Sequence, residues 1–404
     1  MALTITNIRA ICTAPQNIPL VVVKVETSEP GLYGLGCATF TQRFRTVAFE
    51  VENSLKPLLV GKDPSRIEDI WQMVTVSAYW RNGPVLANAL SGVDQALLDI
   101  KGKLANMPVY DLLGGKVREA ARVYRHADGK TMEEIGDRVQ AFMEQGIQVI
   151  RLQHGGYGGN SGGQQSLSAM RPDGACPGAY YDPLQYQLSV VQLFDAMRAR
   201  FGFGVEFCHD VHEHIDPIEA VRLAKELEPY RLFFYEDSLA PEQIEWFSIM
   251  RQQTHTPIAM GELFNNPREW TPLIAQKLID YIRVHISQIG GLTPARKLAA
   301  FCEAYSVRTA WHGPGDVSPV GHAANIHLDV ACWNFGIQEW SGFRQESLDV
   351  FPGCPELRGG YVYPNDKPGL GIDIDEKLAA RFPCSDELPT WTNCRRPDGT
   401  LNRP

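Results

Sequence analysis

The first part of the chain alternates between apolar and polar positions in segments rich in β-branched residues. These segments lie at residues 3–14, 20–27 and 31–40, and Glu29-Pro30-Gly31 forms a turn between the last two. Alternation of this kind predicts a small antiparallel meander. Apolar residues then recur at a spacing of three and four over residues 85–105, which predicts a helix ending before the glycines at 114–115.

From about residue 120 the rhythm changes to short apolar runs that end in polar residues, each followed by a segment suited to a helix. The runs lie at residues 121–126, 149–154, 204–210, 232–237, 257–262, 281–287, 307–313 and 335–340. Strand–helix alternation implies parallel strands. Eight such units favour a closed (β/α)8 (TIM) barrel over an open doubly wound sheet. Neither GxGxxG nor GxxxxGK[ST] follows the first of these strands, which disfavours a nucleotide-binding fold.

These patterns predict an α/β protein with three parts. We expect an α+β capping domain over residues 1–118, a (β/α)8 barrel with a metal site over 119–362, and a C-terminal segment over 363–404. The last segment is rich in turn residues and does not continue the barrel rhythm. We therefore expect it to return to the capping domain and to help cover the barrel mouth.

The composition removes several classes of function. A net charge of −9 argues against a nucleic-acid partner, although a bound divalent cation could still attract an anionic substrate. The nine cysteines are scattered and contain no CxxC pair, which disfavours disulfides and cysteine-ligated zinc. The N-terminus lacks a secretory signal, and no apolar run approaches the ~18 residues that would span a bilayer. We expect a cytoplasmic protein without a membrane partner.

Three carboxylates stand at the ends of successive predicted strands. Asp210, Glu236 and Glu262 are separated from one another by 26 residues, about the length of one barrel unit. Such strand ends converge at the catalytic rim of a barrel. Taken singly, each carboxylate could be a helix cap or an ion-pair partner, but three that converge must shift their protonation or bind a cation. Oxygen ligands select a hard cation, so Mg²⁺ is the expected ion.

The segment FCHDVHEHI at residues 207–215 contains three histidines around the first of these carboxylates. On a strand, Asp210, His212 and His214 would share one face, while His209 would point to the other. His209 is therefore expected to be buried behind the barrel. We interpret His212 as an acid/base residue beside the metal, and a zinc site made of the three histidines as the weaker alternative.

Other predicted strands also end in cationic or titratable side chains. Arg151 and Gln153 end the second strand, Arg283 and His285 the sixth, His312 the seventh and Glu339 the eighth. Such groups around Mg²⁺ suit a substrate that carries a carboxylate and several hydroxyls. The chemistry indicated is removal of the proton next to the carboxylate, with the metal and nearby cations stabilising the enediolate. His212 could then protonate the departing β-hydroxyl.

Long motifs make the chain resemble a known family over nearly its whole length. They lie at residues 79–115, 281–291 (YIRVHISQIGG), 312–324 (HGPGDVSPVGHAA), 334–340 (NFGIQEW) and 363–383. With these motifs the chain resembles the enolase superfamily and, within it, the mannonate dehydratase-like acid-sugar dehydratases. The resemblance implies one Mg²⁺ per subunit on Asp210, Glu236 and Glu262, and a homo-oligomer, either a tetramer or an octamer.

The same resemblance implies roles for further residues. His212 would be the general acid, and Arg151 the arginine that activates a basic tyrosine. The implied substrate contacts are Thr41, His126, Glu262, Arg283, His312, Asp316 and Glu339.

The chain departs from the family pattern at four positions. The position of the basic tyrosine holds Gly163 here, so Tyr157 is the nearest candidate, with Tyr180 and Tyr181 as others. Thr41 stands where many relatives have Asn, and the tryptophan expected near the C-terminus is missing from the final TLNRP. Pro314 resembles the branch of the family with low or no activity on mannonate.

The sequence therefore predicts a Mg²⁺-dependent hydro-lyase of low efficiency. Its substrate would be a six-carbon aldonic acid, with D-mannonate or D-gluconate converted to 2-keto-3-deoxy-D-gluconate. One alternative is a weak or inactive homologue that binds a sugar acid in a regulatory role. Another is a dehydratase or epimerase of a different acid sugar. Epimerisation needs bases on both faces of the substrate, and only His312 could supply the opposite face.

Overall fold

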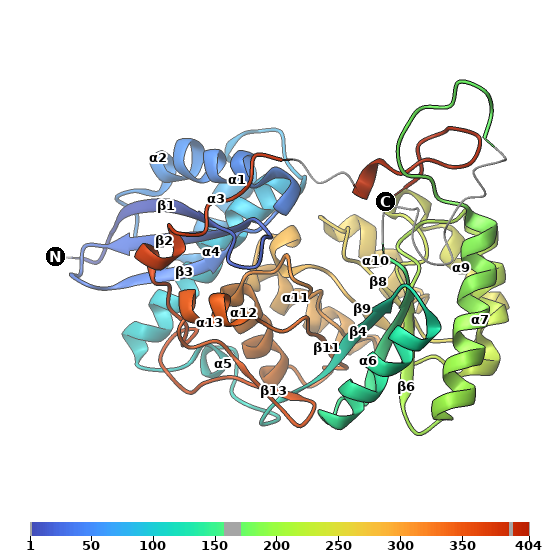
Figure 1. Cartoon of the computed structure of the whole chain (residues 1–404). Helices are drawn as coiled ribbons and strands as arrows, with labels where there is room; N and C mark the ends of the chain where they lie inside the picture. The colour runs from blue at the N-terminus through green and yellow to red at the C-terminus, as the bar shows by residue number, and fades with distance from the viewer. Residues whose placement is uncertain (1, 157–170, 388–390, 404) are drawn as a thin grey trace. The chain divides into compact units, whose positions relative to one another are not determined.

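The computed structural model describes residues 2–156, 171–387 and 391–403 (Figure 1). Its contacts divide the chain into two compact units. The first unit comprises residues 1–122, 262–270 and 282–387, and the second comprises 123–261, 271–281 and 388–404. These units follow spatial contacts, whereas the predicted limits 1–118, 119–362 and 363–404 follow the order of the chain. The predicted limits stay a prediction, and each unit is described by itself.

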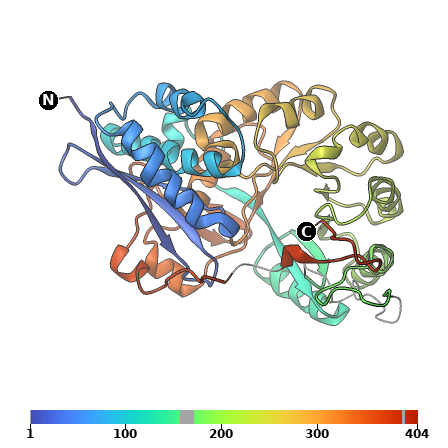
Figure 2. The same cartoon turned by 90° about the horizontal axis from the view of Figure 1, so that it is seen from above.

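The first unit contains the predicted meander. Its strands are β1 (Ile5–Thr13), β2 (Leu20–Thr27) and β3 (Tyr33–Cys37), which pair antiparallel in that order. Helix α4 (Pro84–Ala105) packs closely on this sheet, because β3 presents glycines to it. A Cβ atom on Gly34 would lie only 1.9 Å from the carbonyl oxygen of Ala96. Figure 2 shows the helices of this region lying against the three strands.

Further helices complete the core around the meander. Leu90, Val93 and Leu97 of α4 are buried with Val23 and Val25 of β2. The apolar face of the helix therefore packs on the apolar face of the strand. The helical elements of this region are η1 (Thr41–Arg43), α1 (Phe44–Glu50), η2 (Val51–Leu55), α2 (Lys56–Leu59), α3 (Ile67–Ser77) and α5 (Val109–Leu112).

Every apolar run that predicted a barrel strand contains one. The strands are β4 (Ala121–Gly129), β5 (Val149–His154), β6 (Glu206–Asp210), β7 (Tyr235–Glu236), β8 (Ile258–Met260), β9 (Tyr281–Ile282), β10 (Arg308–Thr309) and β11 (Gln338–Glu339). In the second unit, β4 to β8 pair in parallel in chain order. In the first unit, the amide of Ala310 donates to the carbonyl of Ile282 at 2.8 Å.

The helices between these strands begin where the sequence supplies caps. Thr131, Asp182 and Ser318 each accept a hydrogen bond from the first turn of a helix, and Asp216 forms a capping box with Glu219. The α-helices are α6 (Met132–Glu144), α7 (Pro183–Phe201), α8 (Pro217–Glu226), α9 (Trp246–Gln253), α10 (Pro267–Ala275), α11 (Leu292–Ala304), α12 (Pro319–Ala331), α13 (Gln345–Val350) and α14 (Glu376–Ala379). The short 3-10 turns are η5 (Glu228–Tyr230), η6 (Pro241–Gln243), η7 (Ile286–Ile289) and η8 (Trp391–Asn393).

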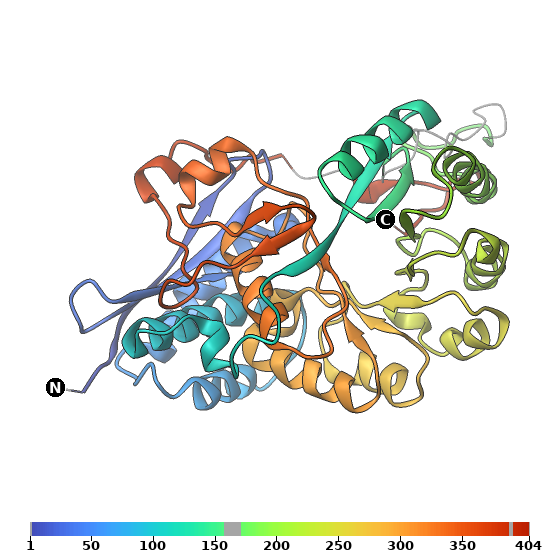
Figure 3. The ribbon, with the colours of Figure 1, turned by 90° about the horizontal axis from the view of Figure 1, so that it is seen from below.

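The C-terminal segment contributes to both units. In the first, β12 (Glu356–Arg358) and β13 (Tyr361–Tyr363) form a hairpin that pairs with the start of β4 (Figure 3). Glu376 of α14 then forms ion pairs with Arg9 at 2.6 Å and Lys24 at 2.8 Å on the meander. In the second unit, Arg396 pairs with Asp216 at 2.7 Å. Among the described residues, no helix is long and apolar enough to cross a membrane.

A buried carboxylate ties the C-terminal segment to α4. Asp99 is fully buried and accepts hydrogen bonds from the amides of Leu370 (2.8 Å) and Leu35 (3.0 Å) and from Lys103 Nζ (2.7 Å). An asparagine would place an NH₂ group against one of these donors. We predict that Asp99→Asn lowers the free energy of unfolding by about 1–3 kcal/mol, the usual cost of a lost buried partner. Thermal unfolding would measure this, with Asp111→Asn on the exposed side of α5 as the control. Equal melting temperatures in the two variants would contradict the prediction.

The backbone at Leu370 is also held by a neutral histidine. His327 accepts from the Tyr110 amide at Nδ1 (3.1 Å) and bonds the Leu370 carbonyl through Nε2 (3.2 Å), which requires one protonated ring nitrogen. Burial lowers the pKa of His327 to about 4, from 6.5 in its ordinary state. Below pH 6.5 this histidine is protonated in the unfolded chain but stays neutral in the folded chain. The free energy of unfolding therefore falls as the pH drops from about 6.5 to about 4.

A glutamine at this position would separate the effect of titration from the effect of hydrogen bonding. Its side chain can donate and accept, but it does not titrate. We predict that the melting temperature of His327→Gln falls less steeply than that of the unmodified protein over this pH window. Identical pH profiles would show that His327 does not contribute.

Candidate functional site

In the second unit, a guanidinium lies beside two of the three carboxylates predicted as metal ligands, Asp210 and Glu236. Arg151 Nη1 is 3.0 Å from Asp210 Oδ2 and 3.9 Å from Glu236 Oε1, and Nη2 is 3.6 Å from Asp128 Oδ1. The exposed fraction is 4% for Arg151, 1% for Asp210 and 0% for Glu236. Charges this deeply buried are stable only when they are paired. The two carboxylates therefore form a site that requires a cation.

The strand register explains how this group assembles. Arg151 of β5 aligns with Cys208 of β6, and Asp210 of β6 aligns with Glu236 of β7. Glu236 aligns in turn with Ala259 of β8, and Glu262 follows two residues after that strand ends. The spacing of 26 residues thus reflects consecutive neighbouring strands, as the sequence predicted. Metal ligation by these three residues stays a prediction.

His212 lies next to Asp210, but the prediction that Asp210, His212 and His214 share one face of a strand was wrong. Strand β6 ends at Asp210, and His212 and Glu213 adopt left-handed backbone conformations with φ of 53° and 51°. Alternation therefore does not extend to His212 and His214. Instead, the amide of His212 donates to Asp210 Oδ1 at 2.8 Å. The predicted general acid and the predicted ligand are thus connected through the backbone.

His209 is buried on the other side of β6. Its Nε2 is 2.8 Å from the hydroxyl of Tyr186, and its Nδ1 is 2.9 Å from the carbonyl of Leu152. Burial lowers the pKa of His209 to about 4, so the ring is neutral near pH 7. This arrangement supports a packing role and not the three-histidine zinc alternative.

Two aromatic residues of this group were missed by sequence reasoning. The hydroxyl of Tyr124, on β4, donates to Glu236 Oε2 at 3.2 Å. The ring of Trp391 lies 5.8 Å from that of His212, so a tryptophan near the C-terminus does meet the predicted acid. His126, a predicted substrate contact, aligns with Arg151 in the β4–β5 register and lies 5.9 Å from the ring of Tyr124.

Three tyrosines were predicted as candidates for the catalytic base, and the structure describes two of them, Tyr180 and Tyr181. Tyr157 lies outside the residues that the structure describes, as does Gly163. Tyr180 donates its hydroxyl to the Cys176 carbonyl at 2.7 Å, and the guanidinium of Arg171 stacks on its ring. Burial raises the pKa of Tyr181 well above its ordinary value of 10. Tyr181 is therefore poorly suited to accept a proton near neutral pH, and the hydroxyl of Tyr180 is already engaged with a backbone carbonyl.

The first unit contains a second charged group. Arg283 is completely buried, with Nη1 2.6 Å from Glu262 Oε2 and Nη2 2.7 Å from Glu339 Oε2. His312 Nε2 lies 3.3 Å from the same oxygen of Glu262, and the amide of Gly313 donates to Glu339 Oε2 at 2.9 Å. The structure therefore brings together four of the residues predicted as substrate contacts, Glu262, Arg283, His312 and Glu339. This is the arrangement expected for residues at the ends of neighbouring strands.

Asp316 and His285 extend this group. Ligand atoms of His285, His312 and Asp316 all lie within 4.8 Å of one another. Burial raises the pKa of Asp316, while burial and the nearby His312 lower that of His285 to about 3. His285 is therefore neutral and suited to donating or accepting a single hydrogen bond. Thr41, the remaining predicted contact, begins η1 and donates its hydroxyl to the Pro19 carbonyl at 3.3 Å.

Comparison with known proteins agrees with this architecture. Residues 4–114 match the mandelate racemase / muconate lactonizing enzyme N-terminal domain, and residues 134–378 match the enolase C-terminal domain-like family. A D-galactonate dehydratase family member of Salmonella enteritidis is 57% identical over 414 residues, covering 100% of this chain and 99% of the relative. A family member of Enterococcus gallinarum is 54% identical over 404 residues, covering 100% and 99%.

A solved structure resembles the chain over its full length. It is an enolase from Pantoea ananatis with bound D-gluconate and Mg, 57% identical, with a TM-score of 0.96 and 100% of both chains covered. These comparisons define the class as a (β/α)8-barrel enzyme with an N-terminal α+β capping domain. The chain belongs to the enolase superfamily and, within it, to the D-galactonate dehydratase family, so it is a hydro-lyase of the acid-sugar dehydratase type.

Proposed function

We propose that the protein is a Mg²⁺-dependent dehydratase of a six-carbon aldonic acid. D-Gluconate is the first candidate substrate, because the relative from Pantoea ananatis binds D-gluconate and Mg. D-Mannonate is the second candidate, and either acid would give 2-keto-3-deoxy-D-gluconate. The family name of the relatives adds D-galactonate to the compounds that should be tested.

The observation that carries this proposal is the buried pair of carboxylates at the ends of β6 and β7. Asp210 and Glu236 are held by a cation already, the guanidinium of Arg151. Carboxylate oxygens on adjacent strands fit Mg²⁺, and Glu262 would supply the third ligand from the end of β8. Bound there, Mg²⁺ would polarise the substrate carboxylate and stabilise negative charge that develops on it.

The side chains of the chain would perform the proton transfers and hold the substrate. Arg283 is fixed by Glu262 and Glu339, so its guanidinium N–H groups would be rigidly placed hydrogen-bond donors for a substrate oxygen. His212 would give a proton to the departing hydroxyl, and His312 and Asp316 would contact the sugar hydroxyls. Thr41, His126 and Glu339 complete the proposed contacts.

The base is proposed to be Tyr157, activated by Arg151. A guanidinium beside a phenol favours the phenolate and so makes tyrosine a usable base. We predict that Tyr157→Phe lowers kcat by about 10²-fold or more, the scale of a lost general base. Tyr180→Phe is the matched control and should retain activity. If Tyr157→Phe turns over normally while Arg151→Met is inactive, the base is another residue, and His312 becomes the next candidate.

We also propose that turnover is slow and that the preferred substrate is an acid sugar other than mannonate. Pro314 and Gly163 differ from the pattern of efficient mannonate dehydratases, and they favour the second candidate function, a sugar-acid-binding homologue with weak chemistry. A homo-oligomer, tetrameric or octameric, is proposed as the working assembly.

A panel of acid sugars tests the proposal. Purified protein with Mg²⁺ would be incubated with D-gluconate, D-mannonate and D-galactonate, and the release of 2-keto-3-deoxy acid would be followed colorimetrically. We expect release from at least one of them and none with a chelator. Specific binding of an acid sugar without any keto acid would favour the regulatory alternative, and the dehydratase proposal would be withdrawn.

A further inference from the structure

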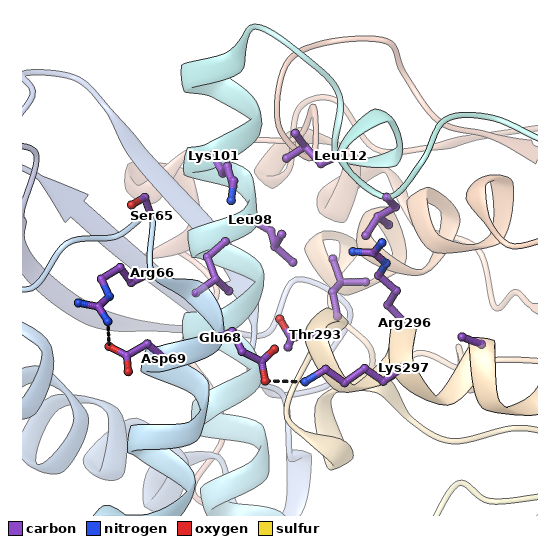
Figure 4. Close-up of a pocket in the computed structure, with 14 residues that line it drawn as sticks. Ser65, Arg66, Glu68, Asp69, Leu98, Lys101, Leu112, Thr293, Arg296 and Lys297 are labelled. Carbon is purple, nitrogen blue, oxygen red and sulfur yellow. Dashed lines mark hydrogen bonds and ion pairs between the residues drawn. The ribbon is translucent and has the colours of Figure 1, made fainter.

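A pocket in the first unit is lined by none of the proposed catalytic residues. It lies among the start of α3, the C-terminal half of α4, the end of α5 and the first turns of α11, and its volume is about 740 Å³ (Figure 4). Pockets for small organic ligands typically span about 300–1,000 Å³. The space is therefore large enough for a small molecule.

One part of the lining is apolar. Leu98 of α4, Leu112 at the end of α5 and Leu113 beside it are half-buried, and Leu292 begins α11. These leucines come from three different elements and share one pocket. Leu292 is already fully buried, so a short hydrocarbon group would remove apolar surface from water at Leu98, Leu112 and Leu113.

The charged part of the lining has an excess of positive charge. Glu68 accepts from Lys297 at 2.5 Å, and Asp69 pairs with Arg66 at 3.4 Å. Both acidic residues of the pocket are thus already paired, as the dashed lines in Figure 4 show. Lys101 and Arg296 also line the pocket, and among the described residues the side chain of neither forms a hydrogen bond or an ion pair. Two cations therefore face the pocket without a counter-charge from its own walls.

We propose that this pocket is a second ligand site, which binds a small organic anion with a short hydrocarbon chain. The carboxylate would lie near Lys101 and Arg296, and the chain would lie on the leucines. An inorganic anion would leave the leucines exposed, and a neutral hydrocarbon would leave the cations without a partner. A medium-chain carboxylate satisfies both parts of the lining.

Fluorescence titration of the Mg²⁺-loaded protein tests the proposal without measuring turnover. Anilinonaphthalene sulfonate is the probe, because it combines an anionic group with an apolar body, and octanoate is the competitor. We expect saturable binding of the probe and its displacement by octanoate. Lys101→Gln/Arg296→Gln should weaken both by about tenfold, because the two charge-assisted contacts would be lost, and water and salt already weaken such contacts at exposed side chains.

Two further variants make the result specific. Arg222→Gln/Lys225→Gln removes the same two residue types from the exposed side of α8, and should bind the probe as the unmodified protein does. Ala300→Trp fills the pocket while keeping its charges, and should also weaken binding.

Three results would overturn the proposal. The first is unchanged probe and octanoate affinity in the Lys101→Gln/Arg296→Gln protein. The second is displacement of the probe by inorganic phosphate but not by octanoate, which would show an anion site without an apolar part. The third is a change of oligomeric state in Ala300→Trp by size-exclusion chromatography with light scattering, which would identify the pocket as an interface between copies of the chain.

Discussion

Glu236→Gln and Asp210→Asn should each lose Mg²⁺ binding while the protein remains folded. Both substitutions keep the side-chain volume and remove one negative charge from a buried site whose oxygen ligands must neutralise a divalent cation. Changes in residues that merely orient metal ligands typically cost 10–100-fold in affinity, so loss of a ligand charge should weaken Mg²⁺ binding by about 100-fold or more. Calorimetric titration with Mg²⁺ would measure the affinity, and circular dichroism would confirm the fold.

Glu206→Gln provides the matched control. Glu206 lies at the opposite end of β6 from Asp210 and is exposed, so the same acid-to-amide change occurs on the same strand. This variant should bind Mg²⁺ normally. Normal Mg²⁺ affinity in Glu236→Gln and Asp210→Asn as well would place the metal elsewhere and remove the basis of the proposed site.

His212→Asn should stop the loss of water while leaving substrate binding in place. Loss of a general acid typically lowers the rate by about 10²–10⁴-fold, and we expect kcat to fall within that range with KM little changed. Removal of the C2 proton needs only the base. The variant should therefore still exchange that proton with solvent, which nuclear magnetic resonance in deuterium oxide would detect.

His255→Asn is the control for this substitution, because the His255 side chain is exposed and lies outside the proposed site. It should dehydrate the substrate at the normal rate. An equally active His212→Asn protein would exclude His212 as the general acid. Loss of both exchange and dehydration in His212→Asn would indicate that this residue positions the substrate.

The order of the strands and the grouping of the charged residues could be predicted because both follow from local patterns. Parallel strands with one helix between them place their ends side by side, so the even spacing of Asp210, Glu236 and Glu262 predicted which strand ends are neighbours. The same reasoning grouped Arg283, His312 and Glu339. In the first unit, Arg283 and His312 both lie within ion-pair distance of Glu339, which agrees with that grouping.

Other features depend on contacts that sequence patterns do not encode. Tyr124 reaches Glu236 across a separation of 112 residues, and nothing in β4 indicates that its hydroxyl bonds a carboxylate of β7. Trp391 meets His212 because the last residues contact the loop after β6, where the Asn402 side chain donates to the His214 carbonyl at 3.3 Å. The left-handed turn at His212 has only a weak signal, since histidine is one of several residues that tolerate it.

The most direct test of Mg²⁺-dependent dehydration is to follow D-gluconate by proton nuclear magnetic resonance in deuterium oxide. The unmodified protein would be incubated with the sugar acid and Mg²⁺, with a parallel sample containing a chelator. We expect the C2 proton signal to disappear and the C3 signals of a 3-deoxy-2-keto acid to appear, in the Mg²⁺ sample only. Dehydration at an equal rate in the chelated sample would contradict the role of the metal. Inversion or exchange at C2 without loss of water would contradict dehydration itself.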